Sequence, residues 1–158
     1  MIFLLAALLL GQPHPVALQR VRVTVRAIAA SNDAAAAPGM DPKLSPIGSH
    51  IEGFGQQFRF RSYKLLEEQS FDLDWKAPAQ MELPGSRSLQ VTPRSLDKDG
   101  KIKVHLELLG SHPAHSRKLH TDYAIQRGGT LLVGGIRVDP GDPKAGTLLI
   151  AVTQGMEK

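Results

Sequence analysis

LDKDGKIKVHLELL, residues 96–109, is the stretch that most clearly indicates the fold. Its D-K-D-G tetrad has the composition of a tight hairpin turn. After the turn, apolar and polar residues alternate, as they do in a strand that buries one face. The apolar positions are Ile102, Val104, Leu106 and Leu108. The stretch therefore predicts a β-hairpin whose second strand covers one side of a hydrophobic core.

The segment that follows, residues 116–126, alternates in the same way and predicts the partner strand. If residue 109 is placed opposite residue 116, apolar residues meet on one face and opposite charges meet on the other. The expected pairs are Ile102 with Tyr123, Leu106 with Leu119, Lys103 with Asp122, Glu107 with Lys118 and His105 with His120. Each pair contributes about 0.2–1 kcal/mol, and a slip of one residue would bury the charges.

Outside this hairpin, short runs rich in Val, Ile, Leu and Thr are separated by turn residues along most of the chain. Residues 21–29 alternate small apolar side chains with polar ones, which predicts a half-buried strand. Residues 58–66 change phase once, which predicts a bulge near Ser62. Together these runs predict an all-β, β-sandwich-like fold with about eight to nine mostly antiparallel strands.

One short helix is expected near residues 43–54. Apolar side chains recur there at the spacing of a single helical stripe. The stripe consists of Leu44, Ile47, Ile51 and Phe54. Asp41, which stands before Pro42, is the type of residue that begins a helix.

Two later runs, TLLVGGI at 130–136 and TLLIAVT at 147–153, are apolar on both faces. Such runs predict strands that are covered on two sides, in the middle of a sandwich or in a barrel wall that faces a second layer. The glycines near the first run are interpreted as structural. Gly128 and Gly129 suit a tight turn with positive φ, whereas Gly134 and Gly135 indicate a bulge or a layer pressed against the strand backbone.

The N-terminus predicts export. Residues 2–10 form an uncharged apolar run that is too short to cross a bilayer as a helix but has the length of a signal-peptide core. We expect residues 1–19 to be a signal peptide and residues 20–154 to form one domain in the periplasm or outer envelope. An uncleaved anchor and a start codon placed too early are the alternatives. The chain has no cysteine, which excludes disulfides and thiolate metal sites.

The formal net charge is +4, and several arginines recur on predicted strands. Arg22, Arg26, Arg59 and Arg61 could line one basic sheet face that meets an anionic ligand. A solvated sheet face is the simpler interpretation. Phe58 and Phe60 alternate with Arg59 and Arg61, but no aromatic residue interleaves with Arg22 and Arg26, and a net charge of +4 is modest, so nucleic acid is not an expected partner.

Four histidines gather around the predicted hairpin, at positions 105, 112, 115 and 120. In the expected register His105 and His120 would be directly opposed and close enough to coordinate a zinc or copper ion. Exposed histidines without a function are the simpler interpretation. The acidic turns at 97–100 and 139–142 lack the spacing of a calcium loop. No phosphate loop and no serine elbow occurs, so we expect neither an enzyme nor a cofactor.

From Leu89 onward, three strings resemble the C-terminal domain of secretins, the outer-membrane ring proteins of type II and III secretion and of type IV pili. They are LQVTPRSLDKDGKIKVHLELLGS, TDYAIQRGGTLLVGGI and GTLLIAVT. The matching positions occur in the family's order, and they are Val91, Pro93, Asp99, Gly100, Gly129, Thr130, Gly134, Gly135, Leu148, Leu149, Ile150 and Thr153. The likeness extends over about residues 21–153, without the N-terminal ring domains of secretins.

This resemblance implies a non-enzymatic envelope protein with a structural or partner-binding role in a secretion or pilus-type assembly. Secretion or pilus machinery proteins are the implied partners, self-association is an alternative, and membrane association is left open. The other function that the residues suggest is a free-standing periplasmic module that binds an anionic ligand through its basic sheet face.

Overall fold

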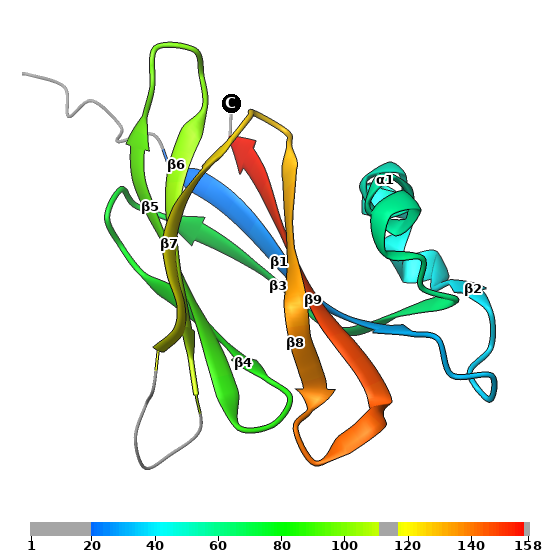
Figure 1. Cartoon of the computed structure of the whole chain (residues 1–158). Helices are drawn as coiled ribbons and strands as arrows, with labels where there is room; N and C mark the ends of the chain where they lie inside the picture. Colours follow the sequence, from blue (N-terminus) through cyan, green and yellow to red (C-terminus); the bar gives the residue numbers. More distant parts are fainter. Residues whose placement is uncertain (1–19, 111–116, 157–158) are drawn as a thin grey trace, which may run out of the picture.

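The alternating runs of the sequence become strands that stack as two sheets, with a helical segment on the outside of one of them (Figure 1). The computed structural model describes residues 20–110 and 117–156. One sheet has the strand order β2 (Gly39–Met40), β3 (Ser62–Leu73), β1 (Val21–Ser31), β9 (Asp142–Met156), β8 (Thr130–Asp139). The other has the order β4 (Ala79–Leu83), β5 (Arg87–Leu96), β6 (Ile102–Leu109), β7 (Arg117–Ile125).

Every strand pairing in the two sheets is antiparallel except that of β2 with β3. The main core lies between the sheets, where alternate residues of β1, β6 and β9 face one another. Its fully buried members include Val23, Val25, Val104, Leu106, Leu148 and Val152. The expectation of an all-β, sandwich-like fold with one short helical segment is therefore confirmed.

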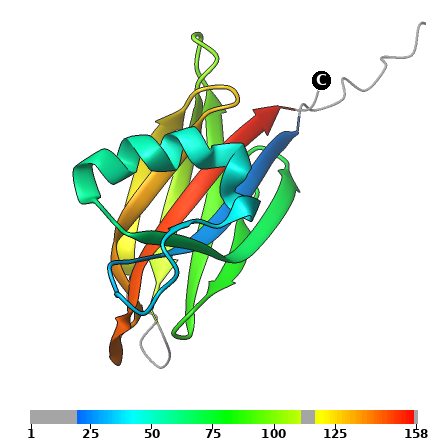
Figure 2. The same ribbon diagram turned by 90° about the vertical axis from the view of Figure 1, so that its right-hand side faces the viewer.

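A second core lies on the outer face of the five-stranded sheet, beneath a 3₁₀ helix (Pro42–Ile47) and α1 (Gly48–Phe58). Figure 2 shows α1 lying across that face. Leu44, Ile47 and Ile51 are buried there, and Phe54 packs against them, as the helical stripe predicts. The Asp41 carboxylate accepts a hydrogen bond from the Lys43 amide at 3.0 Å, which satisfies a donor at the start of the helical segment.

The helix is longer than predicted, and the strand expected to begin at Phe58 begins at Ser62 instead. Arg59 ends α1 in the left-handed conformation, with its amide donating to the Gly55 carbonyl at 2.7 Å. The bulge expected near Ser62 is also misplaced. The register of β3 against β1 shifts between Ala27 and Ile28, so the extra residue is Leu66.

The two doubly apolar runs differ in their positions. β9 lies between β1 and β8, and it sends Leu148 and Ile150 into the main core but Leu149 into the core under α1. For this strand the prediction of cover on both sides is confirmed. β8 is instead the edge of its sheet, and nine of its ten residues are either partly buried or exposed. The prediction of a central position for β8 is wrong, although Leu131 and Val133 pack against the main core and Leu132 packs against the core under α1.

The hairpin of β6 and β7 forms with a register two residues away from the expected one. Ile102 pairs with Ile125 rather than Tyr123, and Glu107 pairs with His120 rather than Lys118. The expected partner of Lys103, Asp122, pairs with His105. Because the shift is an even number of residues, the apolar side chains of β6 still face the core.

The pressed layer and the bulge expected at the glycines of β8 both occur, at different positions. A Cβ on Gly134 would stand 2.6 Å from Leu149 Cδ2, so here a layer does press on the backbone. Gly135 has open space around it but a φ of +112°, within a register shift between Val133 and Ile136. At Gly135 the expectation of a pressed layer is therefore wrong, and the expectation of a bulge is confirmed. Gly128 has the positive φ of the predicted turn, and a Cβ on Gly129 would approach the Gln126 carbonyl oxygen at 2.9 Å.

The predicted signal peptide, residues 1–19, and the loop histidines His112 and His115 lie outside the described residues. The D-K-D-G hairpin turn is confirmed. Gly100 has a φ of +79°, and the Asp97 carboxylate accepts hydrogen bonds from the Asp99 and Lys101 amides, both at 2.9 Å. Pro93 lies within β5, just before a register shift.

Candidate functional site

The outer face of the four-stranded sheet carries a cluster of two histidines and one glutamate. Because Val104, Leu106 and Leu108 of β6 face the core, His105 and Glu107 point away from it. His120 of β7 pairs directly with Glu107 in the observed register, which brings the second histidine to the same place. Sequence reasoning names both histidines but not Glu107, because the expected register pairs that residue with Lys118.

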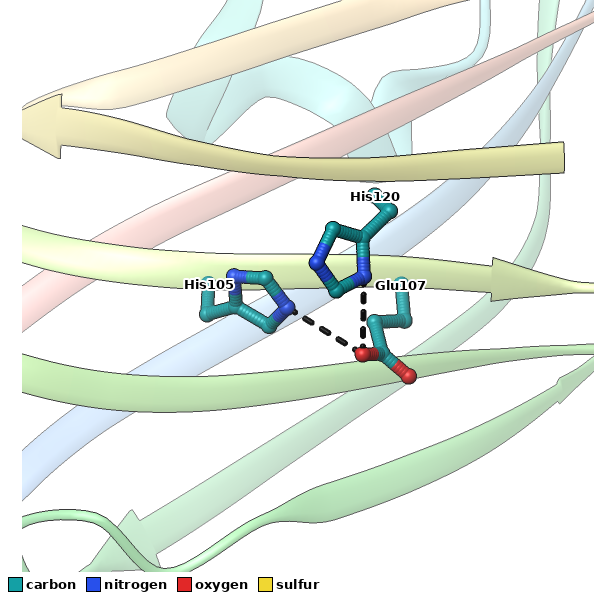
Figure 3. A group of neighbouring side chains, drawn as sticks. All are labelled: His105, Glu107 and His120. Atoms are coloured by element: carbon teal, nitrogen blue, oxygen red, sulfur yellow. Dashed lines mark hydrogen bonds and ion pairs between the residues drawn. The ribbon is translucent and has the colours of Figure 1, made fainter. Parts of the chain in front are cut away.

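One carboxylate oxygen lies at the centre of this cluster (Figure 3). Glu107 Oε1 is 3.2 Å from His105 Nε2 and 3.0 Å from His120 Nδ1. The imidazole rings meet edge to face, with their centroids 4.5 Å apart. The histidines are therefore diagonal neighbours rather than the directly opposed pair that the sequence predicts, yet their rings are in contact.

Asp122 fixes the ring of His105 from the other side. His105 Nδ1 donates to Asp122 Oδ1 at 2.5 Å, and this hydrogen bond is the main cause that lowers the pKa of the Asp122 carboxyl. His105 is 7% exposed, so its ring is enclosed by these neighbours. Both ring nitrogens of His105 thus face a carboxylate oxygen, Asp122 Oδ1 at Nδ1 and Glu107 Oε1 at Nε2.

In the acidic turns, aspartate carboxylates accept hydrogen bonds from backbone amides of the same turn. Asp139 accepts a hydrogen bond from the Gly141 amide at 2.8 Å, and Asp142 accepts one from the Lys144 amide at 2.9 Å. The carboxylate of Asp97 is used in the same way. Ordinary turn chemistry accounts for these residues.

The four arginines expected on one basic face do not form one. Arg22 and Arg26 lie on β1, where carboxylates of β3 neutralise them. Arg22 Nε lies 3.0 Å from Asp72 Oδ1, and the hydrogen bond from Arg22 is the main cause of the lowered pKa of Asp72. Arg26 is only 8% exposed, and its Nε lies 2.7 Å from Glu68 Oε2.

Arg59 and Arg61 lie elsewhere, between the end of α1 and the start of β3. The backbone amide of Arg61 donates to the Asn32 side chain at 2.8 Å, which ties this linker to the loop after β1. In register, Ser62 pairs with Ser31 at one end of β1, whereas Asp72 pairs with Arg22 near the other. Arg22 thus lies near the far end of β1 from Arg61, and Arg26 lies in the middle of that strand.

An apolar groove lies where α1 meets the edge strand β8. The rings of Phe54 and Phe58 stack with their centroids 4.4 Å apart, and Phe58 is 54% exposed. The groove has a volume of about 300 Å³. It is lined by Phe54, Phe58, Phe60, Gly134, Gly135, Thr147 and Leu149. Sequence reasoning misses this groove because it assigns Phe58 and Phe60 to a strand.

A second hollow, of about 490 Å³, shares Phe60 and Thr147 with the groove. Arg137 and Lys144 contribute positive charge to its lining, and Asp33 contributes one negative charge. The apolar groove therefore continues into a polar, mainly basic region along β8 and β9.

Within residues 20–110 and 117–156, neither helical segment is long and apolar enough to span a membrane. The chain matches no protein-family model, and comparison with curated proteins and with solved structures gives no match.

Proposed function

We propose that the chain is a non-enzymatic envelope protein with a secretin-like β domain, and that it binds an extended segment of a secretion or pilus-type assembly protein along β8. The single observation that carries this proposal is the apolar groove beside an edge strand. The sequence resemblance to secretins supports the class of partner. The apolar run at residues 2–10 supports export to the periplasm or outer envelope.

The edge of β8 offers backbone groups for strand addition. Among the described strands, β8 has a hydrogen-bonded neighbour only in β9. An unpaired edge is a template for another chain, and many peptide-binding domains use one in this way. The last part of β8 is occupied, since the buried Arg87 side chain donates to the Val138 carbonyl at 2.6 Å. The accessible portion is therefore the part before Val138.

The groove provides the place for a side chain. In strand addition, backbone hydrogen bonds supply affinity and pockets beside the edge supply specificity. The stacked Phe54 and Phe58 rings favour a large apolar side chain, and Arg137 and Lys144 favour an acidic residue further along. The expected ligand is thus an extended segment that carries one large apolar and one acidic side chain.

The alternative function, binding of an anionic ligand through the basic sheet face, has less support. Such a face needs unneutralised charge, but Arg22 and Arg26 are paired with carboxylates. The remaining pair, Arg59 and Arg61, lies off the sheet, between the end of α1 and the start of β3.

The proposal is tested by photo-cross-linking in the native host. A photoreactive phenylalanine derivative is placed at position 58, in the groove, or at position 96 as a matched control. Leu96 is also a large exposed apolar residue, 44% exposed, but it lies on β5 of the other sheet. We expect position 58 to give an adduct with an envelope protein, mapped by mass spectrometry to a strand-forming segment, and position 96 to give none.

A synthetic peptide of the mapped segment then gives the affinity. Phe58→Ala is expected to weaken binding of the peptide by about tenfold or more, because a few buried aromatic side chains supply most of the binding energy in such interfaces. Equal cross-linking from both positions would refute the proposal. So would adducts from position 58 that contain only a second copy of this chain, which would identify the groove as a self-association surface.

A further inference from the structure

We propose that His105, Glu107 and His120 form a binding site for one divalent transition-metal ion of the zinc and copper class. This inference is independent of the partner-binding role, because it concerns the outer face of the other sheet. His105 and Glu107 are two residues apart on β6, so they share a face, and the cross-strand pair of Glu107 with His120 completes the set.

The donor atoms are already close to the spacing that a metal ion requires. With bonds of about 2.0–2.1 Å, tetrahedral ligand atoms stand about 3.3 Å from one another. Glu107 Oε1 lies 3.2 Å from His105 Nε2 and 3.0 Å from His120 Nδ1, and all three atoms lie within 4.8 Å of one another. Small side-chain movements are therefore enough to bring the two nitrogens onto one ion with the carboxylate.

Asp122 provides the support that histidine ligands in metal sites usually have. A metal-binding histidine almost always donates its other ring N–H to a carboxylate, a carbonyl or water, which sets the tautomer and the ring orientation. His105 Nδ1 makes this bond to Asp122 at 2.5 Å, which directs Nε2 toward Glu107. A metal ion would bind the Nε2 lone pair of His105, and the hydrogen bond from Nδ1 to Asp122 would remain.

The donor set selects the class of ion. Imidazole nitrogens suit zinc, copper and nickel, whereas magnesium and calcium prefer oxygen ligands. Two imidazoles and one carboxylate are three protein ligands, which leaves a coordination position for water or for a group on a partner. His120 lies on the exposed side of the cluster, so this position would face solvent.

The test is a calorimetric titration of the full chain, without a histidine tag, with Zn²⁺ or Cu²⁺, and with Mg²⁺ as the negative control. We expect one Zn²⁺ or Cu²⁺ ion per chain and no binding of Mg²⁺. Glu107→Gln, which keeps the side-chain shape, and His120→Ala should each weaken binding by more than about tenfold. Asp122→Asn should weaken it by about 10–100-fold, as loss of a supporting hydrogen bond does.

Two controls separate this site from other histidines. His50→Ala, on the exposed side of α1, should leave the affinity unchanged. The double variant His112→Ala/His115→Ala should retain binding. The imidazole ¹⁵N resonances of the folded protein, assigned by NMR, should show metal contact at His105 Nε2 and His120 Nδ1. Unchanged affinity in Glu107→Gln and His120→Ala, or loss of binding only in the loop double variant, would overturn the proposal.

Discussion

Replacing Gln154 with methionine should stabilise the protein. Gln154 is completely buried, and the alternation along β9 turns it toward the main core, on the same side as Val152. Neither its Nε2 nor its Oε1 has a hydrogen-bond partner in the described part of the chain. A buried amide without partners carries a desolvation cost that an apolar side chain of similar length does not have.

The size of the effect follows from that cost. Burying an unpaired amide costs about 1–3 kcal/mol in mutational data. Methionine is flexible and nearly as long as glutamine, so it should fill the same space without strain. We therefore expect Gln154→Met to raise the free energy of unfolding by about 1–3 kcal/mol. For a domain of this size, that corresponds to an increase of about 3–10 °C in Tm.

Urea denaturation followed by circular dichroism measures this change directly. Gln69→Met is the matched control, because Gln69 lies exposed on β3 and the same substitution there should change stability by less than about 0.5 kcal/mol. A lower stability for Gln154→Met would refute the reasoning. It would show that the amide is satisfied inside the core, as a buried water can do for a polar group.

Other substitutions give equally specific expectations. Gly134→Ala should lower the free energy of unfolding by about 1–3 kcal/mol, because the new Cβ would collide with Leu149 Cδ2. Gly135→Ala should lower it by about 1–2 kcal/mol, because alanine is strained at the positive φ of this position. Urea midpoints equal to that of the wild type would contradict both predictions. The hydrogen bond from the Lys43 amide is the main cause that lowers the pKa of the Asp41 carboxyl. The ionised Asp41 carboxylate therefore stabilises the fold fully above about pH 4, and this stabilisation is lost as the pH falls through the lower folded-state pKa. The Tm difference between wild type and Asp41→Ala should therefore narrow below about pH 4, and a constant difference would exclude the carboxylate as its cause. Protein exported by the native host should have the intact mass of a chain without residues 1–19, and a mass that includes them would contradict the signal peptide.

The hairpin shows how far the sequence pattern reaches. Alternation places Val104 and Leu106 in the core correctly, because a strand has only two faces. The same pattern cannot distinguish registers that differ by two residues, since every side chain then keeps its face. The expected register depends on where the loop between β6 and β7 closes, and the alternation contains no information on that point. The cluster around Glu107 depends on this register, so the sequence shows its histidines but not its carboxylate.

The arginines show a second limit. Arg22 and Arg26 are visible in the sequence as charges on the polar side of a strand, but their neutralisation depends on β3, about 45 residues away along the chain. Pairing β1 with β3 places Asp72 opposite Arg22 and Glu68 opposite Arg26. Long-range pairings of this kind decide whether a run of charges is a binding surface or part of the sheet. Local periodicity does not predict them.

The two proposed sites lie on opposite outer faces of the sandwich, and this arrangement makes their tests independent. The metal cluster is on β6 and β7, whereas the groove lies between α1 and β8, with the main core between the two sheets. Substitutions at separated sites that share no partners have additive effects. Glu107→Gln should therefore leave cross-linking from position 58 unchanged, and Phe58→Ala should leave the metal affinity unchanged. Each variant thus serves as the folding control for the other site. A variant that removed both activities would report damage to the common core rather than the loss of either site.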